Sequence, residues 1–135
     1  MSLISIDYLG DLKTKAVHRI SGVELLTNAP PDNNGKGESF SPTDLLATAI
    51  GSCMLTIMGI SAKSNKIKFN IAKLSVEKTM SLNPRRVGGL NINIQLSKEL
   101  NKKERLILER AATHCPVAKS IHPDINENIL IEYTL

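Results

Sequence analysis

The sequence predicts an α+β fold in which antiparallel sheet wraps around helices. Strand-like alternation and turn signals fill both ends of the chain, whereas the middle holds an uncharged apolar run over residues 45–62. A chain of 135 residues can bury one core but is too short for two independent ones. We therefore expect a single domain over residues 1–135.

Three short strands are predicted in the first part of the chain. Apolar residues alternate with polar ones over residues 2–9 and a Gly-Asp pair follows, which indicates a half-buried strand ending in a turn. Two more strands are expected near residues 13–20 and 22–28. Residues 30–37 combine prolines, glycines, Asn and Asp, and so predict a loop.

A long helix is predicted from Pro42 to about Lys63. Ser41 suits the N-cap, Pro42 suits the first helical position, and Asp44 complements the helix dipole three residues after the cap. Because the run over residues 45–62 is apolar on nearly every face, the helix must be buried on nearly every face.

One small sheet cannot easily cover such a helix. We therefore infer that it packs against its own copy in a second chain, so that the functional unit is a homodimer. A membrane span is the alternative interpretation. The run of about 18 residues falls short of the roughly 20 that a span needs, and polar or small residues interrupt it, so we expect no membrane partner.

The second half of the chain predicts two strands, a helix and a last strand. Residues 67–71 and 72–77 alternate in opposite phase, which indicates one long strand with a bulge or bend near residues 71–72. A turn region over residues 83–89 leads to an amphipathic strand over 90–96 that pairs back as an antiparallel hairpin. The remaining signals are Asn101 and Glu104 at the start of a second helix, Leu108, Ala111, Ala112 and Cys115 at helical spacing, and Ile129, Ile131 and Tyr133 in a last strand.

The net charge of +4 raises the question of a nucleic-acid partner. The basic residues are spread over every predicted element and mixed with acidic ones, which is typical of a solvated surface. With two Phe, two Tyr and no Trp, a platform for stacking bases is hard to build. We expect no nucleic-acid partner, and because the chain start lacks the features of a secretory signal, we expect a cytoplasmic protein.

Two cysteines, Cys53 and Cys115, stand 62 positions apart, which excludes a C-x-x-C redox motif. Together with three histidines they match no standard zinc-ligand spacing, so we expect no metal and no cofactor. Cys53 lies on the apolar face of the long helix, and taken alone it is most simply a small buried hydrophobe.

Cys115 has a more distinctive context because Pro116 follows it. A residue before proline avoids the α region, and proline suits the first position of a helix, so Cys115 is expected to cap a short helix. The N–H groups there would stabilise a thiolate and lower the pKa of Cys115. An inert cysteine at a helix junction explains the same pattern equally well.

Read together, the two cysteine segments resemble the OsmC/Ohr family of thiol peroxidases. Residues 41–53, SPTDLLATAIGSC, resemble its pattern of N/S-P, two often acidic or polar residues, Leu, a run of small residues and Cys. Residues 114–120, HCPVAKS, are similar to its C-P-x-S/A segment after the second helix. The order of predicted elements agrees with the family fold across nearly the whole chain.

The resemblance implies an intertwined homodimer with central helices embraced by antiparallel sheets and an active site at the interface. It also implies an antioxidant role in oxidative stress. In peroxidatic members the cysteine at the position of Cys53 reduces a hydroperoxide, and the one at the position of Cys115 resolves the sulfenic acid as a disulfide. A sulfenic acid without such a thiol goes on to sulfinic acid. An external dithiol must then restore the enzyme.

The resemblance is incomplete at the residues that surround the thiol. Peroxidatic members use a glutamate just after the N/S-P proline, where this sequence has Thr43, and Asp44 lies one residue further along. They also use an arginine from an early strand, for which Lys15 is the best match and Arg19 the match in a shifted placement. His18 could serve near the thiol, although a structural or exposed histidine is the simpler interpretation.

Two functions from the family therefore stay open, and both are carried forward. The first is a cysteine-based peroxidase acting on organic hydroperoxides or hydrogen peroxide. The second is a dimer that has lost fast peroxidase chemistry and serves as a small-molecule-binding or redox-sensing protein, which the missing glutamate favours.

Overall fold

The computed structural model describes residues 3–135 and confirms the predicted α+β class. The chain divides into two compact units, Met1–Leu46 and Ala47–Leu135. The elements, in chain order, are β1 (Ile4–Gly10), β2 (Lys13–His18), β3 (Glu24–Asn28), the short 3₁₀ helix η1 (Pro31–Asn33), α1 (Pro42–Ser64), β4 (Ala72–Ser81), β5 (Arg86–Leu96), α2 (Lys102–Ala112), α3 (Pro116–Ser120) and β6 (Asn126–Tyr133).

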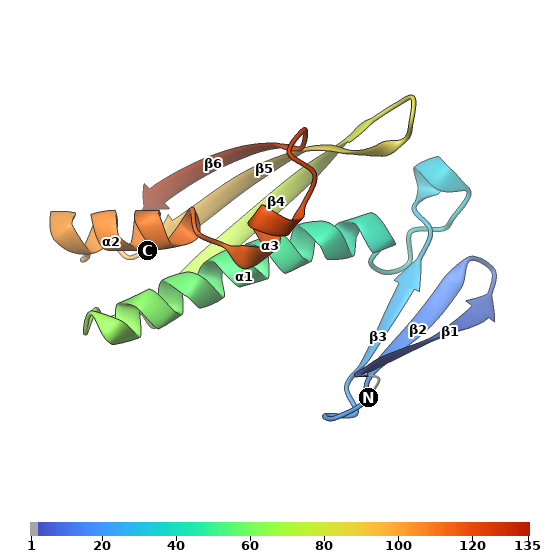
Figure 1. Ribbon diagram of the computed structural model, residues 1–135, viewed down its shortest axis with the longest axis horizontal. Coiled ribbons are helices and arrows are strands. Elements are labelled where there is room, and N and C mark those ends of the chain that lie inside the picture. Colours follow the sequence, from blue (N-terminus) through green and yellow to red (C-terminus); the bar gives the residue numbers. More distant parts are fainter. Residues whose placement is uncertain (1–2) are drawn as a thin grey trace. The chain divides into compact units, whose positions relative to one another are not determined.

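The first unit is built on an antiparallel sheet in the order β1-β2-β3, so all three strands predicted there are confirmed (Figure 1). Ala16, in the middle strand, lies opposite Ile6 on one side and Leu25 on the other. β1 is shifted toward the C-terminus of its predicted range, and β2 and β3 are each two residues shorter than predicted, because the ends of the alternating pattern fall in turns.

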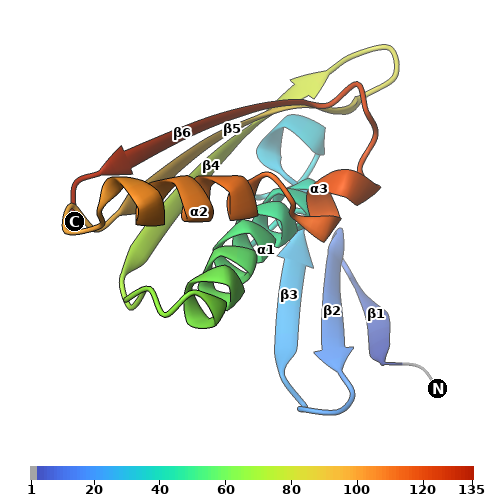
Figure 2. The same cartoon turned by 60° about the vertical axis from the view of Figure 1, so that its left-hand side comes forward.

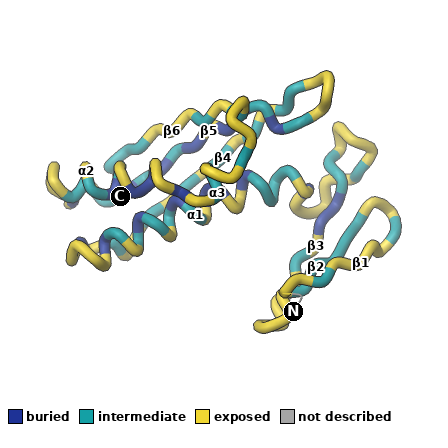
Figure 3. The backbone as a smooth tube through the Cα atoms, in the orientation of Figure 1, coloured by how far each residue is buried: buried dark blue, intermediate teal, exposed yellow. Residues whose placement is uncertain are grey.

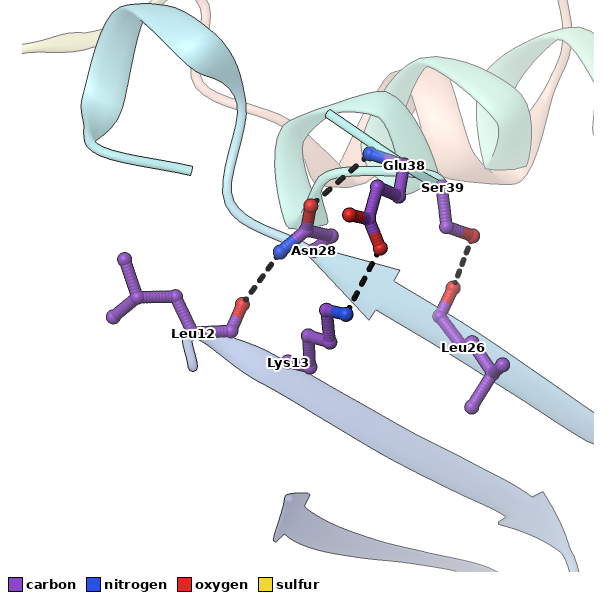
Figure 4. A network of polar contacts seen from close by, with 6 residues as sticks. All are labelled: Leu12, Lys13, Leu26, Asn28, Glu38 and Ser39. Carbon is purple, nitrogen blue, oxygen red and sulfur yellow. Dashed lines mark hydrogen bonds and ion pairs between the residues drawn. The ribbon is translucent and has the colours of Figure 1, made fainter. Parts of the chain in front are cut away.

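Asn28, at the end of β3, fastens the loop that follows it. This side chain is buried; its amide nitrogen donates to the Leu12 carbonyl (3.3 Å) and its amide oxygen accepts from the Glu38 backbone N–H (3.0 Å) (Figure 4). Lys13 pairs with the Glu38 carboxylate at 2.9 Å. These bonds satisfy loop backbone groups that would otherwise be left without partners near the sheet.

Both ends of α1 have recognisable capping structures. The Ser41 hydroxyl accepts from the Asp44 N–H (3.0 Å), and the Asp44 carboxylate accepts from the Ser41 N–H (2.9 Å), which confirms the predicted N-cap. At the other end Lys66 has a positive φ of 55°, and the Ile67 N–H donates to the Ala62 carbonyl (2.8 Å). This is a Schellman termination, which commonly places an apolar residue where Ile67 lies buried.

The strand predicted over residues 67–71 is therefore wrong. Ile67 is apolar because it covers the end of α1, and the strand begins only at Ala72. The expected bend near residues 71–72 is the strand's start, and the irregularity in β4 lies instead between Thr79 and Met80.

The second unit holds a sheet in the order β4-β5-β6, with α1 and α2 on the same face of it (Figures 1 and 2). β4 and β5 form the predicted antiparallel hairpin, in which Val76 lies opposite Ile92. β6 pairs with β5 in parallel, so the expectation of wholly antiparallel sheet is wrong for this strand. A parallel pair needs a crossover, and α2 and α3 supply it.

The core of this unit lies between β5 and α1, where buried positions concentrate (Figure 3). Leu90, Ile92, Ile94 and Leu96 of β5 are buried, as are Ile50, Met54, Met58 and Ala62 of α1. Gly51 lets α1 approach β4 closely, since a Cβ there would lie 2.7 Å from Leu74 Cδ2. By length and mean hydropathy (1.8) α1 could also span a membrane, and buried helices of globular domains share both properties.

The predicted turn over residues 83–89 is too long at its C-terminal end. Gly88 and Gly89 lie within β5, where a Cβ on Gly88 would approach the Ser81 hydroxyl oxygen to 1.8 Å. The glycines reflect close packing between the two strands rather than a turn.

α2 begins as predicted and ends before Cys115. The Asn101 side chain accepts from the Glu104 N–H (2.9 Å) and the Glu104 carboxylate accepts from the Asn101 N–H (3.0 Å), a complete capping box. The helix stops at Ala112, so Cys115, which was grouped with it by spacing, belongs to the next element.

Candidate functional site

Cys53 and Cys115 both lie in the second unit, and the structure brings them together. Cys53 is half-buried on α1, whereas Cys115 is 0% exposed just before α3. The Cys115 sulfur lies 3.8 Å from the Ile50 carbonyl oxygen, one helical turn before Cys53. Cys53 lies close enough to raise the pKa of the Cys115 thiol. Both are free in this structure.

The local sequence explains how Cys115 reaches α1. After α2 ends, the His114 ring nitrogen Nδ1 bonds to the Arg110 carbonyl (2.7 Å), which holds the turn. Cys115 is extended (φ −68°, ψ 120°) because Pro116 follows it, and Pro116 opens α3. The Ala118 N–H donates to the Cys115 sulfur at 3.5 Å. The predicted helix cap is thus confirmed.

The predicted direction of the Cys115 pKa is wrong. Burial raises the pKa of this thiol because it disfavours the charged thiolate, and the contact with Cys53 raises it further. The backbone N–H groups of Ala118 and Val117 lower the pKa, as expected, but they do not outweigh burial. Cys115 is therefore held as a neutral thiol at neutral pH.

Thr43 and Asp44 lie in the first turn of α1. This turn belongs to the first unit, which ends at Leu46, whereas the rest of the helix belongs to the second. The Asp44 carboxylate is used in the capping box with Ser41, and the Thr43 hydroxyl lies 3.2 Å from the Ser41 hydroxyl. Both side chains therefore take part in the helix cap.

Lys15, His18 and Arg19 lie on or after β2, in the first unit. Lys15 is half-buried in the middle of the sheet, with its Cα opposite those of Asp7 and Leu26. His18 Nδ1 lies 2.6 Å from the Ser21 hydroxyl at an exposed turn. The exposed Arg19 donates its backbone N–H to the Leu3 carbonyl (2.8 Å).

Three groups at the thiol pair are backbone atoms that side-chain motifs do not reveal: the Ile50 carbonyl and the N–H groups of Val117 and Ala118. The Cys-Pro pair predicted a helix cap, and therefore N–H groups close to the Cys115 sulfur. Nothing in the sequence predicted the Ile50 carbonyl, because it comes close to Cys115 only through tertiary packing.

Over residues 3–135, no group of three or more His, Cys, Asp or Glu side chains is arranged to hold a metal ion. Within the described residues, the groups that contact the Cys115 thiol are the Ile50 carbonyl and the backbone N–H of Ala118.

The family model described as OsmC-like protein matches residues 35–129, which include both cysteines and most of the chain. The chain belongs to the OsmC-like family. This confirms the resemblance drawn from the two cysteine segments, both of which lie within the matched range.

Solved structures of OsmC-like proteins share the fold. A Psychrobacter arcticus protein, provisionally described as an osmotic stress induced and detoxification response protein, is 48% identical, with 98% of this chain and 96% of that chain covered and a TM-score of 0.92. An organic hydroperoxide resistance protein from Legionella pneumophila is 16% identical, with 98% and 96% covered and a TM-score of 0.77.

An organic hydroperoxide resistance protein from Elizabethkingia anophelis, whose crystal structure contains thiocyanate, is 16% identical; 99% of this chain and 98% of that chain are covered, and the TM-score is 0.72. At this identity the last two comparisons establish the OsmC fold. No curated protein matches the sequence.

Proposed function

We propose that this OsmC-like protein is a cysteine-based peroxidase that reduces organic hydroperoxides or hydrogen peroxide. Membership of the family, together with the stress-response and hydroperoxide-resistance relatives, supports a role in redox stress. The observation that carries the finer proposal is that the buried Cys115 sulfur lies 3.8 Å from the Ile50 carbonyl of α1, one helical turn from the half-buried Cys53. A structural role for either cysteine alone does not require such a pair.

The proposed reaction has three balanced steps. The Cys53 thiolate attacks one peroxide oxygen and the O–O bond breaks, leaving a sulfenic acid on Cys53 and an alkoxide or hydroxide that takes up a proton. The Cys115 sulfur then attacks the Cys53 sulfur, and the hydroxyl group leaves as water with the Cys115 proton. An external dithiol supplies the two electrons and two protons that reduce the disulfide.

The division of roles follows from exposure and ionisation. Cys115 is fully buried and held neutral, so it is poorly suited to meet a peroxide first. Cys53 has exposed surface on α1 and sits next to the thiol that can resolve it. We further propose a cytoplasmic homodimer as the working form, with neither metal nor cofactor.

A second candidate function is redox sensing or small-molecule binding by a dimer without fast peroxidase chemistry. It is favoured by Thr43, which stands where peroxidatic members have glutamate, and by Asp44, whose carboxylate is used in the helix cap. A sensor would form the same disulfide but at a slow rate.

Stopped-flow measurement of peroxide consumption with excess dithiol separates the two functions. For a peroxidase, the parent protein turns over many equivalents of hydrogen peroxide or cumene hydroperoxide, whereas Cys53→Ser does not. For a sensor, the disulfide forms stoichiometrically and slowly, and no sustained consumption follows. If Cys53→Ser consumes peroxide at the parent rate, the assignment of Cys53 as the attacking thiol is wrong.

A further inference from the structure

We propose that the sheet of the second unit carries, on the face that points away from α1, a binding site for a primary alkyl ammonium ion, the charged end of a small alkyl amine. This face is on the other side of the sheet from the cysteine pair, and the inference does not depend on the proposed peroxidase function. The central residue of the site is Asn93 of β5.

The alternation of β4 and β5 decides which side chains reach this face. Leu74 points toward α1, where a Cβ on Gly51 would meet its Cδ2, and Ile94 opposite it is buried. Ser75 and Asn93, one position away on each strand, therefore point to the opposite face. The helices of this unit lie on the first side of the sheet (Figure 2), so within the described residues no helix of the unit covers the second.

A shallow groove of about 660 Å³ crosses all three strands on this uncovered face. Its polar side chains and one leucine stand in two neighbouring rows, the first formed by Ser75, Asn93 and Leu130 and the second by Glu77, Asn91 and Asn128. Side chains within such a row are about 5 Å apart, and successive rows are about 7 Å apart. One small ligand can therefore contact both rows.

The orientation of the Asn93 side chain follows from its partner on β6. Its amide nitrogen lies 3.2 Å from a carboxylate oxygen of Glu132, and because a carboxylate only accepts hydrogen bonds, the NH₂ group must face it. The Asn93 amide oxygen is thereby turned away from Glu132. It is buried and has no hydrogen-bond donor within the described residues.

A buried acceptor without a donor gains free energy from any donor that reaches it. Ser75 and Leu130, which flank Asn93 in its row, are both exposed and can turn to admit one. The missing hydrogen bond of Asn93 therefore points to a ligand that donates from the groove.

Two more acceptors stand beside the Asn93 oxygen. The Ser75 hydroxyl belongs to the residue opposite Asn93 on β4, and the Glu77 carboxylate is the next side chain on the same face of that strand. Within the part of the chain that the structure describes, neither side chain forms a hydrogen bond or an ion pair. A primary ammonium group has three N–H donors and no acceptor, which matches this set of three acceptors.

Charge complementarity favours a cation over a neutral ligand. Among the residues that line the groove, Glu77 is acidic and none is basic, although basic residues outnumber acidic ones in the whole chain. Lys73, the nearest basic side chain along β4, borders a separate and smaller cavity. Leu130 is 57% exposed and offers an apolar surface to the methylene groups next to the nitrogen. An alkyl amine fits this combination better than a sugar does.

The probe that tests the ligand class is n-pentylamine, titrated into isotope-labelled protein at neutral pH while NMR follows the backbone amide resonances. Matched probes separate the features of the ligand. The alcohol n-pentanol lacks the charge, pentyltrimethylammonium keeps the charge without N–H donors, and sorbitol offers many hydroxyl groups without either.

We expect n-pentylamine to shift the resonances of Ser75, Glu77 and Asn93 in a saturable way. It should bind about fivefold or more tightly than the matched probes, since charge-assisted hydrogen bonds are stronger than neutral ones. The absence of saturable shifts would overturn the inference. Equal or tighter binding of any matched probe would do so as well.

Variants of the protein test the acceptors. Glu77→Gln removes the charge and should weaken n-pentylamine binding by about two- to fivefold, the range for an exposed ion pair. Glu99→Gln removes an exposed carboxylate outside the groove and is the matched control, which should bind like the parent. A loss in Glu99→Gln as large as in Glu77→Gln would show that binding follows net charge and would contradict the site.

The buried acceptor is tested in a Glu132→Gln protein, because replacing Asn93 there frees no carboxylate. Adding Asn93→Leu keeps the shape of the side chain, removes the acceptor and should weaken n-pentylamine binding by about tenfold. Asn93→Ser repeats the test if circular dichroism shows that the leucine variant is not folded. Unchanged binding in the folded variant would rule out the role of Asn93. No peroxide is used, so these results stand apart from the peroxidase test.

Discussion

At the scale of single residues, the two cysteines differ mainly in their access to solvent. Cys115 is completely buried and capped by backbone amides, whereas Cys53 is half-buried on the helix beside it. On the proposed function, a peroxide would therefore reach Cys53 with less rearrangement of the second unit than Cys115. This difference leads to two predictions.

The first prediction concerns the oxidation products of each cysteine variant. Cys53→Ser should abolish peroxide turnover. Cys115→Ser should be oxidised once at Cys53 and then, with excess peroxide, accumulate sulfinic and sulfonic acid because no thiol traps the sulfenic acid. Mass spectrometry after stoichiometric and then excess peroxide checks both. If Cys115 is oxidised first in Cys53→Ser with turnover retained, the roles are reversed.

The second prediction concerns stability at alkaline pH. The pKa of Cys115 is raised in the folded state, so folding favours the protonated thiol. Its stabilising contribution is complete below the unfolded pKa, near 9, and is lost as the pH rises through the folded pKa. Urea unfolding of the reduced protein should show stability falling above about pH 9.

The control for that prediction is Cys115→Ser, because a serine hydroxyl does not titrate in this range. Burial also raises the pKa of Tyr133, with help from Glu109, so both proteins should lose some stability at high pH. The parent should lose more. Parallel curves for parent and variant would mean that Cys115 does not contribute to the alkaline loss.

The residues that cap helices were the most predictable features of the chain, and one of them, Cys115, belongs to the site. Ser41, Asn101 and Cys115 were each expected at a helix start, because capping depends on residues within four positions of one another. The pKa of Cys115 was not predictable in this way. It depends on how deeply the tertiary fold buries the sulfur, for example against the Ile50 carbonyl of α1, and the neighbouring sequence does not show this.

At the scale of elements, the packing of α1 on β4 depends on Gly51. A Cβ at this position would lie 2.7 Å from Leu74 Cδ2, so Gly51→Ala must displace that side chain. The displaced atom is the end of a flexible, half-buried side chain, so moving it costs little and roughly offsets the gain of up to about 1 kcal/mol from alanine's helix propensity. We therefore expect Gly51→Ala to change the free energy of unfolding by less than about 1 kcal/mol in urea unfolding.

The matched control for Gly51→Ala is the same change in a Leu74→Ala background, where the displaced side chain is absent. There the substitution should be neutral or stabilising, so the double-mutant cycle should show coupling between the two positions. Strictly additive effects would show that the contact does not set the spacing of α1 and β4.

The capping box of α2 offers a second test at this scale. Asn101→Ala removes the acceptor of the Glu104 N–H and should lower the free energy of unfolding by about 1 kcal/mol. Asn101→Asp keeps an acceptor and should retain most of the stability. A loss in the aspartate variant as large as in the alanine variant would contradict this account.

The errors at this scale share a cause. The apolar Ile67 was assigned to a strand, yet it covers the end of α1; Gly88 was assigned to a turn, yet it allows close strand contact. Parallel pairing of β6 was also missed. Alternation reports which side chains are buried, but the element that buries them, and the direction of a partner strand, are set by tertiary contacts.

At the scale of the whole molecule, α1 has an exposed side without any charge. Thr48, Ser52, Thr56 and Ile60 follow one another at four-residue spacing, and all are exposed; Ile60 is 58% exposed. Only 33% of the most apolar window of this helix is buried within the single chain. Such a surface is typical of a helix that packs against another subunit.

We therefore predict a stable homodimer in dilute solution, and sedimentation velocity at micromolar concentration checks it. Ile60→Lys places a charge in the uncharged stripe and should shift the protein toward monomer, whereas Leu82→Lys, at an exposed turn residue in the second unit, should not. A folded monomer in the parent protein would rule out the dimer.

The parallel pairing of β6 also bears on how such proteins diverge. Cys115 is carried on the connection between β5 and β6, whereas Cys53 is part of the central helix. Connections accept substitutions and length changes more readily than core elements do. A lineage could thus gain or discard its second thiol by drift in this crossover while the sheet and α1 persist, and descendants of one scaffold would then differ in redox chemistry without differing in architecture.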